Sequence, residues 1–400
     1  MNILSDRINK LSESETLAMT QKSRELQAQG HDVINLSIGE PDFNTPDVVK
    51  EYAKKAIDDN YTHYTPVSGY LDLRQAICAK FKRDNNLDFK PDQIVVSNGA
   101  KQSLANVVMS LINPGDEIIV PAPYWVSYKE IIKLADGSPI YITATVDQDF
   151  KVTAAQIEAA ITPKTKLLMF SSPCNPTGSV YTKEELKSIA EVIAKHPNIF
   201  ILADEIYEHI NFVGKHESIA QFEFIKDKVI TVNGVSKGFA MTGWRIGFIG
   251  APSIIAKACD KLQGQITSAP SSIAQRATIK ALECNPNETK AMIDMVAAFR
   301  ERRDLLLDLL KDIPGLKTNT PAGAFYVFPD ISYYFGKTDG TFVINNADDL
   351  CTYIINKVYV ALVSGGAFGS PDCMRISYAT SKDRLIEAVK RIKMALAELK

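Results

Sequence analysis

The sequence predicts an α/β fold in which a large domain, with a mostly parallel central sheet covered by helices, is joined to a smaller α+β domain. Two observations carry this prediction. From about residue 94, short β-branched runs alternate with longer segments of helical apolar periodicity. Beyond about residue 311 the alternation gives way to a mixture of strands and helices. Short buried strands separated by crossover helices are typical of parallel sheets with helices on both faces.

The elements of the large sheet can be located from these apolar runs. The first run is followed by apolar residues at helical spacing over 104–111. Thr182 predicts a helix start, because Glu184 and Glu185 stand in the turn that follows it. The predicted strands are 94–96, 118–120, 140–146, 167–170, 199–202, 229–232 and 246–249.

A long helical pattern over 287–311 opens the second domain, and Pro314 and Gly315 are its stop signals. The chain before residue 46 does not fit the large sheet, and we expect it to join this second domain. The predicted division is an N-terminal arm over 1–15, a small domain from 16–46 and 286–400, and a large domain over 47–285. Further strands are expected at 324–328, 359–363 and 374–378, and helices at 347–357 and 381–399.

Composition excludes several classes of protein. Hydrophobic residues make up 46% of the chain, and 45 basic residues against 47 acidic ones give a net charge of −2. This balance argues against nucleic acid or an anionic membrane as the main partner. The longest uncharged stretch, 167–182, is shorter than the ~20 apolar residues of a membrane span. The six cysteines stand singly and the five histidines are scattered, so we expect a cytoplasmic protein with no disulfide framework and no metal.

Polar residues follow four of the predicted strands, at the edge where open α/β sheets bind ligands. The turn over 97–102 contains Gly99 and opens a helix, which suits a phosphate group, although an ordinary N-cap is the commoner explanation. Asn175 lies between two prolines, and its bond to Pro176 is a candidate cis peptide. An ordinary Pro/Gly loop is the alternative at this position.

Two further strand ends carry charged residues. Asp204 closes the run over 199–202, where a buried carboxylate needs a cationic partner unless it simply caps a helix. Lys237 follows the run over 229–232 among small residues. Burial lowers the pKa of a lysine and makes it a candidate nucleophile, whereas an isolated loop lysine more often reaches solvent.

One cofactor needs this combination of groups, namely pyridoxal 5'-phosphate. A lysine forms a Schiff base with it, and a carboxylate pairs with the pyridinium nitrogen so that the ring remains an electron sink. Asn and Tyr side chains donate to its phenolic oxygen, while arginine and helix N–H groups bind its phosphate.

The sequence resembles the class I/II aminotransferases of fold type I. The stretch over 234–247, which contains Lys237 and Arg245, matches the family's pyridoxal-phosphate attachment pattern at every specified position. The resemblance covers essentially the whole chain, from the motif at 36–43 to the motif at 374–378. Within the family the chain is most similar to the bacterial aspartate aminotransferases that lack the usual distal arginine.

The resemblance implies a role for each of these residues at the cofactor. Lys237 would hold the cofactor and then move the proton of the substrate Cα. Asp204 would pair with the pyridinium nitrogen, Asn175 and Tyr207 with the phenolic oxygen, and Trp125 would stack on the ring, although core packing is the alternative for this tryptophan. The residues implied around the phosphate are Gly99, Ala100, Lys101, Ser236 and Arg245.

The resemblance also implies substrate contacts and a homodimer. Arg375 would bind the α-carboxylate with help from the backbone N–H of Gly39, although a turn glycine with positive φ is the alternative for Gly39. Lys101 would contact the side-chain carboxylate of the substrate, and Thr16 would lie beside it. Tyr64 would reach the cofactor phosphate of the neighbouring subunit.

The activity implied is the reversible transfer of the amino group from L-aspartate to 2-oxoglutarate, giving oxaloacetate and L-glutamate by ping-pong kinetics. Ser12 stands where prephenate-accepting relatives have a lysine, which argues against prephenate. The alternatives are an aminotransferase for neutral or aromatic amino acids and a carbon–sulfur lyase on the same fold. A silent ligand-binding regulator is disfavoured because Asp204, Lys237 and Arg375 are all present, and a nicotinamide oxidoreductase because no G-x-G-x-x-G motif follows a strand.

Overall fold

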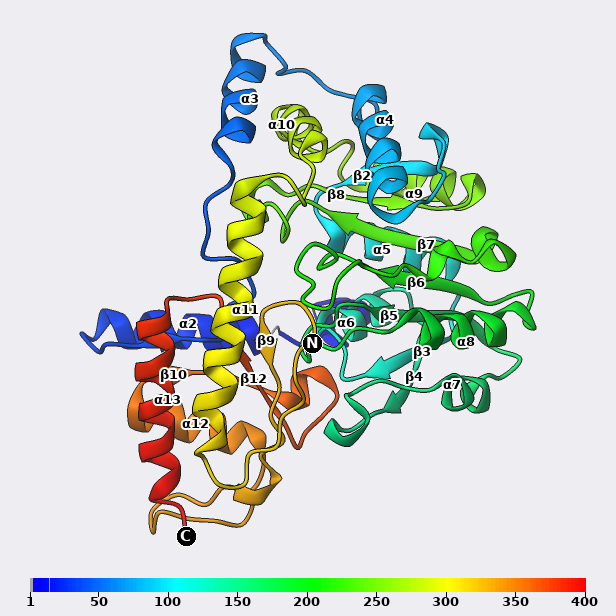
Figure 1. Cartoon of the computed structure of the whole chain (residues 1–400). Coiled ribbons are helices and arrows are strands. Elements are labelled where there is room, and N and C mark those ends of the chain that lie inside the picture. Colours follow the sequence, from blue (N-terminus) through cyan, green and yellow to red (C-terminus); the bar gives the residue numbers. More distant parts are fainter. Residues whose placement is uncertain (1–2, 14) are drawn as a thin grey trace.

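The computed structural model describes residues 3–13 and 15–400, and its central feature is a seven-stranded sheet (Figure 1). The strand order is β2-β8-β7-β6-β5-β3-β4, and β8 runs antiparallel to both of its neighbours. The prediction of a mostly parallel sheet is therefore confirmed. The strands are β2 (Ile94–Ser97), β3 (Glu117–Ala122), β4 (Ser138–Thr143), β5 (Thr165–Ser171), β6 (Phe200–Asp204), β7 (Val229–Gly234) and β8 (Gly247–Gly250).

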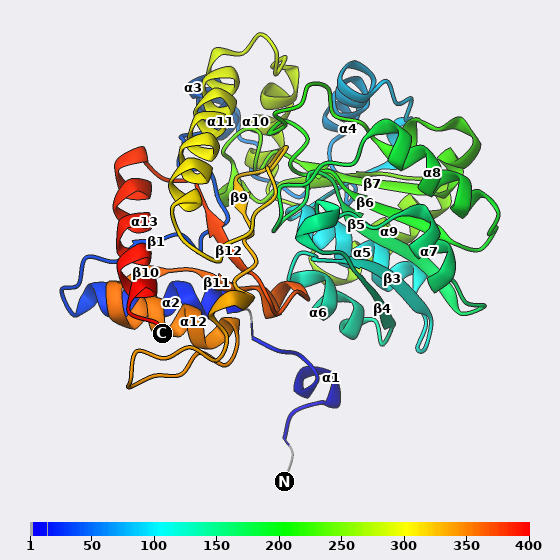
Figure 2. The same ribbon diagram turned by 60° about the horizontal axis from the view of Figure 1, so that its bottom comes forward.

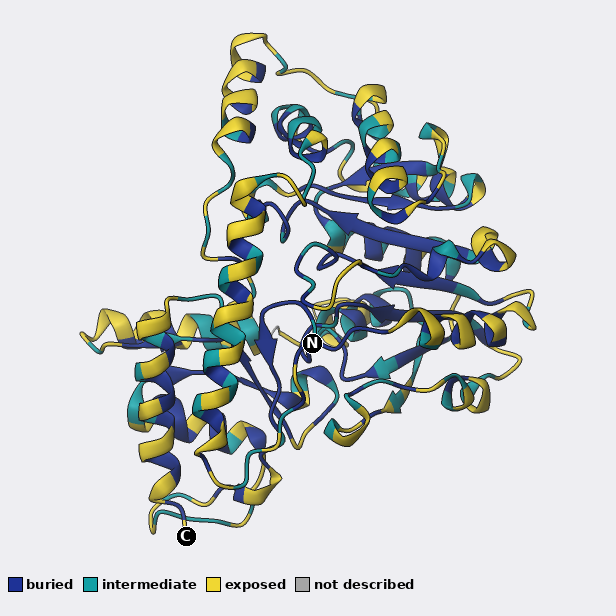
Figure 3. Ribbon diagram, viewed as in Figure 1, coloured by how far each residue is buried: buried dark blue, intermediate teal, exposed yellow. Residues whose placement is uncertain are grey.

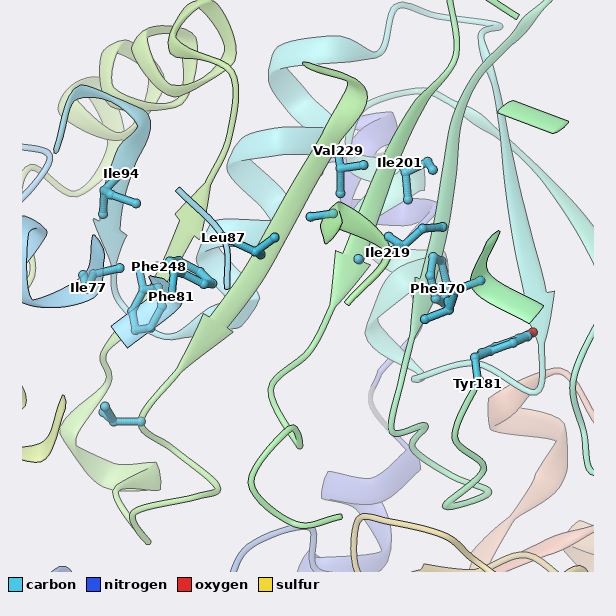
Figure 4. Packing of buried hydrophobic residues seen from close by; sticks show 14 of the residues in the cluster. Ile77, Phe81, Leu87, Ile94, Phe170, Tyr181, Ile201, Ile219, Val229 and Phe248 are labelled. Atoms are coloured by element: carbon cyan, nitrogen blue, oxygen red, sulfur yellow. The ribbon is translucent and has the colours of Figure 1, made fainter. Parts of the chain in front are cut away.

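Side chains of the central strands alternate between two hydrophobic clusters. On β5, Leu168 and Phe170 belong to one cluster, whereas Leu167 and Met169 belong to the other. This period of two buries both faces of the sheet, as Figure 3 shows by the dark strands between helices with exposed outer sides. Figure 4 shows part of the first cluster, in which Phe81 and Phe248 lie edge to face.

Helices cover the two faces of the sheet. One cluster includes residues of α5 (Ala100–Leu111), α6 (Ser127–Leu134) and α9 (Ser253–Ile266). The other includes residues of α3 (Asp47–Asp58), α4 (Leu71–Lys80), α7 (Ala154–Ala160), α8 (Lys183–Ala194) and α10 (Ser272–Glu283).

Helix α8 begins where the sequence predicts it. The Thr182 hydroxyl accepts from the backbone N–H of Glu185 at 3.2 Å, and the Glu185 carboxylate accepts from the N–H of Thr182 at 2.7 Å. This reciprocal pair satisfies two N–H groups that the first turn of a helix leaves free. By contrast, β4 ends at Thr143, earlier than the expected 146, because Val146–Gln148 form a capped 3-10 turn.

The C-terminal part of the chain builds two smaller sheets. In one, β12 (Met374–Ser377) lies between β11 (Val363–Ser364) and β9 (Tyr326–Val327) with antiparallel pairing. In the other, β1 (Ile34–Asn35) pairs in parallel with β10 (Val360–Ala361), so the N-terminal segment meets the C-terminal one. The helices beside them are α2 (Glu15–Ala28), α11 (Lys290–Lys311), α12 (Ala347–Val358) and α13 (Lys382–Ala397).

Two expected strands in this part are shorter than predicted. The run over 359–363 divides at Leu362 into β10 and β11, and Tyr359 is excluded because it ends α12 with a φ of +57°. The run over 324–328 shortens to Tyr326–Val327, since Ala324 has a φ of +55° that a strand does not accommodate.

The N-terminal segment carries the short helix α1 (Asp6–Asn9), which Figure 2 shows below α6. Met1, Asn2 and Ser14, which the predicted arm includes, lie outside the described residues. No helix in the described ranges is both long and apolar enough to cross a membrane. All six cysteines are free thiols.

Candidate active site

The ends of β5, β6 and β7 open into a cavity of about 300 Å³. Residues of the smaller sheets, among them Tyr326 and Arg375, line it from the other side. The cavity thus lies at the carboxyl edge of the parallel strands, where the sequence predicts a site. The sequence-predicted residues that line it are Thr16, Gly39, Ala100, Lys101, Trp125, Asn175, Asp204, Tyr207, Ser236, Lys237, Arg245 and Arg375.

Lys237 points into this cavity. Its Nζ donates to the carbonyl oxygen of Gly39 at 2.5 Å and lies 5.7 Å from the ring centre of Tyr207. Burial lowers the pKa of Lys237 to about 8, and the positive charges of Arg375 and Arg245 act in the same direction. The amine therefore loses its proton far more readily than a surface lysine does, which excludes a solvated loop position.

Asp204 ends β6 with its carboxylate buried. Its Oδ2 accepts from the Tyr128 hydroxyl at 2.9 Å, and its Oδ1 accepts from the backbone N–H of Ile206 at 3.3 Å. Burial raises the pKa of Asp204 to about 6, although both hydrogen bonds oppose the rise. Within the described ranges no side-chain cation lies within ion-pair distance of it. A protonated ring nitrogen in the cavity would provide the missing positive partner.

Arg375 is a buried cation on β12 that has no carboxylate partner in the described part of the chain. Its Nη1 donates to Asn175 Oδ1 at 2.9 Å and its Nη2 donates to the Ser37 carbonyl at 2.6 Å, while its buried Nε has no partner. The guanidinium also lies 4.6 Å from the ring centre of Tyr326 and 4.9 Å from that of Phe368. A fixed, uncompensated guanidinium of this kind fits a small carboxylate ligand.

The start of α5 and Arg245 form one wall of the site. Gly99 is the N-cap of α5 with a φ of +84°, and a Cβ there would overlap the guanidinium of Arg245. Arg245 donates to the carbonyl of Thr242 at 2.8 Å and to that of Asn98 at 3.3 Å. Free N–H groups at a helix start next to an arginine fit a phosphate group.

Trp125 and Lys101 lie at the mouth of the cavity. Trp125 is half-buried and meets Tyr128 edge to face, and the Lys101 Nζ lies 5.0 Å from the Trp125 ring centre. Partial burial and the charge of Arg245 lower the pKa of Lys101. The tryptophan therefore has one side in the cavity instead of being closed into the core.

Two predicted residues do not line the cavity. Gly99 and Tyr64 are both missing from its lining, and Tyr64 is 98% exposed. Two conformations considered from the sequence are also wrong, namely a positive φ at Gly39 and a cis bond between Asn175 and Pro176. Gly39 does not have positive φ, and the reason for a glycine there is instead that a Cβ would approach the Tyr326 hydroxyl to 2.8 Å.

The cis bond considered between Asn175 and Pro176 is not present. Cis peptides precede Pro123 and Pro173, and the Asn175–Pro176 bond is not one of them. A hydrogen bond from the N–H of Gly178 to the carbonyl of Cys174 already fixes the turn around Asn175.

Sequence reasoning missed two tyrosines of the site. Tyr128 holds Asp204 from within α6, and the Tyr326 hydroxyl lies 2.7 Å from that of Tyr207. Tyr326 belongs to a wholly apolar run, so nothing marks it as different from its neighbours. The only available signal for Tyr128 is its place three residues after Trp125, where the chain turns into α6 and the Tyr128 N–H donates to the Trp125 carbonyl at 2.9 Å.

The fold and the cavity define a class of protein. It is an α/β protein whose strand ends carry an amine, a buried carboxylate and a cradle for an anion. The chain belongs to the family described as aminotransferase class I and II, whose model matches residues 31–392. The predicted family and the predicted fold type are thus confirmed.

Individual relatives agree with the family over the whole length. The chain is 46% identical to a bifunctional aspartate aminotransferase and glutamate/aspartate-prephenate aminotransferase of Petunia hybrida, over 99% of this chain and 83% of the relative. It is 46% identical to an aspartate/prephenate aminotransferase of Cereibacter sphaeroides, over the full length of both.

Solved structures show the same fold. The aspartate aminotransferase of Rhizobium meliloti superposes with a TM-score of 0.95 at 40% identity, covering 99% of both chains. That of Thermus thermophilus, solved with maleate, superposes with a TM-score of 0.91 at 38% identity, covering 99% of this chain and all of the other.

Proposed function

We propose that this protein is an aspartate aminotransferase that uses pyridoxal 5'-phosphate and transfers the amino group of L-aspartate reversibly to 2-oxoglutarate. The observation that carries the proposal is a single cavity that holds Lys237, the unpaired carboxylate of Asp204 and the unpaired guanidinium of Arg375. The names of the relatives support the choice of aspartate.

The residues present fit the cofactor. The Lys237 amine would hold it, and the Asp204 carboxylate would accept a hydrogen bond from the protonated ring nitrogen. The Nδ2 of Asn175 and the hydroxyl of Tyr207 would donate to its phenolic oxygen. When bound, pyridoxal phosphate supplies an electron sink for the bond that breaks at the substrate Cα. The groups proposed for its phosphate are those of Gly99, Ala100, Lys101, Ser236 and Arg245.

The substrate would be held at both ends. Arg375 would bind the α-carboxylate, with the N–H of Gly39 beside it, and Lys101 would contact the side-chain carboxylate near Thr16. Because the pKa of Lys237 is lowered to about 8, its amine can accept the Cα proton near neutral pH and release it again.

The first experiment is a half-reaction. The protein saturated with pyridoxal phosphate is mixed with L-aspartate and no oxo acid, and the visible absorption of the bound cofactor is followed. We expect the band to fade with release of one equivalent of oxaloacetate, and to return when 2-oxoglutarate is added. Fading with alanine or an aromatic amino acid but not with aspartate would contradict the aspartate assignment. Release of pyruvate and ammonia with no oxo acid acceptor present would indicate a lyase.

Two variants separate the substrate contacts. We expect Arg375→Lys to weaken aspartate and alanine alike, because a lysine cannot make the bidentate contact. Lys101→Ser should lower kcat/KM for aspartate about 10–100-fold while changing that for alanine little, because only aspartate loses a charged partner. Equal losses for both amino acids in Lys101→Ser would refute the contact to the side chain.

We further propose a homodimer in which Tyr64 reaches the cofactor phosphate of the other subunit. Tyr64 is exposed and does not line the cavity of its own chain, which supports this arrangement.

The proposed domain division remains an arm over 1–15, a small domain from 16–46 and 286–400, and a large domain over 47–285. Free thiols support a cytoplasmic location.

A further inference from the structure

Tyr326 on β9 touches two of the groups that the proposed function needs. Its hydroxyl oxygen lies 2.7 Å from that of Tyr207, and both side chains are buried. Its ring faces the Arg375 guanidinium, whose carbon lies 4.6 Å from the ring centre. Tyr326 therefore connects the residue proposed for the cofactor oxygen with the residue proposed for the substrate carboxylate.

The pair of hydroxyls holds two protons, and only one of them can lie between the two oxygens. Burial raises the pKa of both tyrosines, so both are protonated at neutral pH. Within the described ranges neither hydroxyl has another hydrogen-bond partner. If Tyr207 donated to Tyr326, it would present only lone pairs to a phenolic oxygen in the cavity. Donation to the cofactor therefore requires that Tyr326 supply the shared proton.

Arg375 favours this direction. A cation over the ring of a phenol stabilises its ionised form and makes its hydroxyl a stronger donor. The charge of Arg375 opposes the rise in the pKa of both tyrosines, but among the described contacts its guanidinium lies over the ring of Tyr326 and not over that of Tyr207. The more acidic phenol of the pair is thus Tyr326, which is the better placed of the two to donate.

Gly39 leaves room for this hydroxyl. A Cβ at position 39 would lie 2.8 Å from the Tyr326 oxygen, closer than van der Waals contact permits. A side chain there would push Tyr326 away from its partner. The hydroxyl is consequently fixed between Gly39 on one side and Tyr207 on the other.

We propose that Tyr326 is a positioning residue, whose hydroxyl donates to the Tyr207 oxygen and so directs the single Tyr207 proton toward the phenolic oxygen of pyridoxal phosphate. This inference rests on the proposed function. An oxygen that accepts a hydrogen bond becomes a stronger donor through its own proton, so Tyr326 also strengthens the bond that Tyr207 makes. Tyr326 itself touches neither the cofactor oxygen nor the reacting atoms in this role.

The test is a pH titration of the visible absorption of the loaded protein, compared with Tyr326→Phe. A donor at the phenolic oxygen stabilises its ionised form and lowers the pH midpoint of the colour change. We expect Tyr326→Phe to raise this midpoint by about 0.5–1. A midpoint that falls would show that Tyr207 donated to Tyr326 and was freed by the change, and an unchanged midpoint would show no coupling. Either result overturns the inference.

A double variant tests whether Tyr326 acts through Tyr207. In a Tyr207→Phe background, Tyr326→Phe should shift the midpoint no further, because the intermediary is gone. A further shift would overturn the inference. Tyr334→Phe is the matched control, since it removes a buried hydroxyl that donates to the Pro314 carbonyl far from the cavity, and it should leave the midpoint unchanged.

Further measurements distinguish a failure of this inference from a folding defect and from a failure of the proposed function. The KM for L-aspartate should change less than about twofold in Tyr326→Phe, because the ring over Arg375 remains. If Tyr326→Phe does not fold, Gly39→Ala should raise the midpoint by displacing the same hydroxyl. Absence of any Lys237-dependent colour in the unaltered protein would refute the proposed function, a result distinct from an unshifted midpoint in Tyr326→Phe.

Discussion

Burial brings the pKa values of two residues in the cavity toward neutrality from opposite sides. The pKa of Lys237 falls to about 8 and that of Asp204 rises to about 6, in each case chiefly because burial disfavours the charged form. The amine becomes a usable nucleophile and base, whereas the carboxylate remains mostly ionised at neutral pH. Both are residue-scale effects of the same desolvation, applied to charges of opposite sign.

The lowered pKa of Lys237 predicts how the rate of cofactor loading depends on pH. Only the neutral amine attacks an aldehyde, and with a pKa of about 8 the neutral fraction rises about tenfold between pH 7 and pH 9. An ordinary lysine would give a rise of about a hundredfold over the same interval. Stopped-flow absorbance after mixing the cofactor-free protein with pyridoxal phosphate measures the rate.

Lys237→Ala is the control for this measurement. It should show none of the absorbance change that reports cofactor loading, because it lacks the amine that attacks the aldehyde. A rise near a hundredfold in the unaltered protein would contradict the assignment of a buried, easily deprotonated amine to Lys237.

At the scale of elements, a buried ionic cluster joins the end of α4 to the turn after β6. The Lys80 ammonium pairs with the Glu208 carboxylate and donates to Asn85 Oδ1 at 2.9 Å, and the Asn85 amide donates to Glu208 at 2.9 Å. Although burial opposes it, Lys80 and the histidines 209 and 216 hold the pKa of Glu208 well below its usual range. The cluster anchors the turn that begins with Asp204.

Removing the cation of this cluster should be costly. We expect Lys80→Met to lower the free energy of unfolding by about 3–5 kcal/mol, because it leaves Glu208 buried without its strongest partner. Lys80→Met/Glu208→Leu should recover most of the loss, since two apolar groups leave no charge unpaired. Urea denaturation of the three proteins measures the difference.

The sign of the pH dependence provides a second check. Glu208 has a depressed folded-state pKa, so its stabilising effect is present above its unfolded pKa and is lost as the pH falls through the folded one. In Lys80→Met that effect is absent, and the destabilisation should therefore shrink toward acid pH. A penalty that stays constant would show that lost packing, and not the charge, is responsible.

At the scale of the whole molecule, the exposed aromatic Tyr64 lies in the segment between α3 and α4, two helices that both pack on α10 and carry other exposed apolar residues. Tyr52 and Ile57 on α3 and Leu71 on α4 are also exposed. Exposed large apolar side chains are candidates for an interface between subunits. This region is the surface on which we expect a second copy of the chain.

A mixing experiment tests the shared site. Light scattering should give about twice the chain mass of 44.1 kDa. Tyr64→Ala and Lys237→Ala should each be nearly inactive. Subunits of the two variants, unfolded and refolded together, should regain about a quarter of the normal activity, because each hybrid dimer has one complete site. A monomer, or no regained activity, would contradict the proposed dimer.

Much of this molecule could be predicted from sequence alone, because local patterns report on local structure. The apolar runs located every strand of the large sheet, and Thr182 located the start of α8. Residues of the cavity such as Lys237 and Asp204 could be found because charged groups directly after buried strands are rare. The division of 359–363 at Leu362 could not be predicted, since all of its residues favour a strand and pairing with β1 and β12 decides where each strand ends.

The sequence by itself determined the fold class, the family and the set of polar residues that meet at the strand ends, since these depend on periodicity and on residue types at fixed spacings. Only the tertiary structure decided the contacts between segments far apart in the chain. The Tyr326 hydroxyl contacts that of Tyr207, more than a hundred residues away in the chain. The same hydroxyl lies so close to position 39 that only a glycine fits there. Such contacts arise from packing of distant surfaces, which leaves no periodic signal in the chain for either partner.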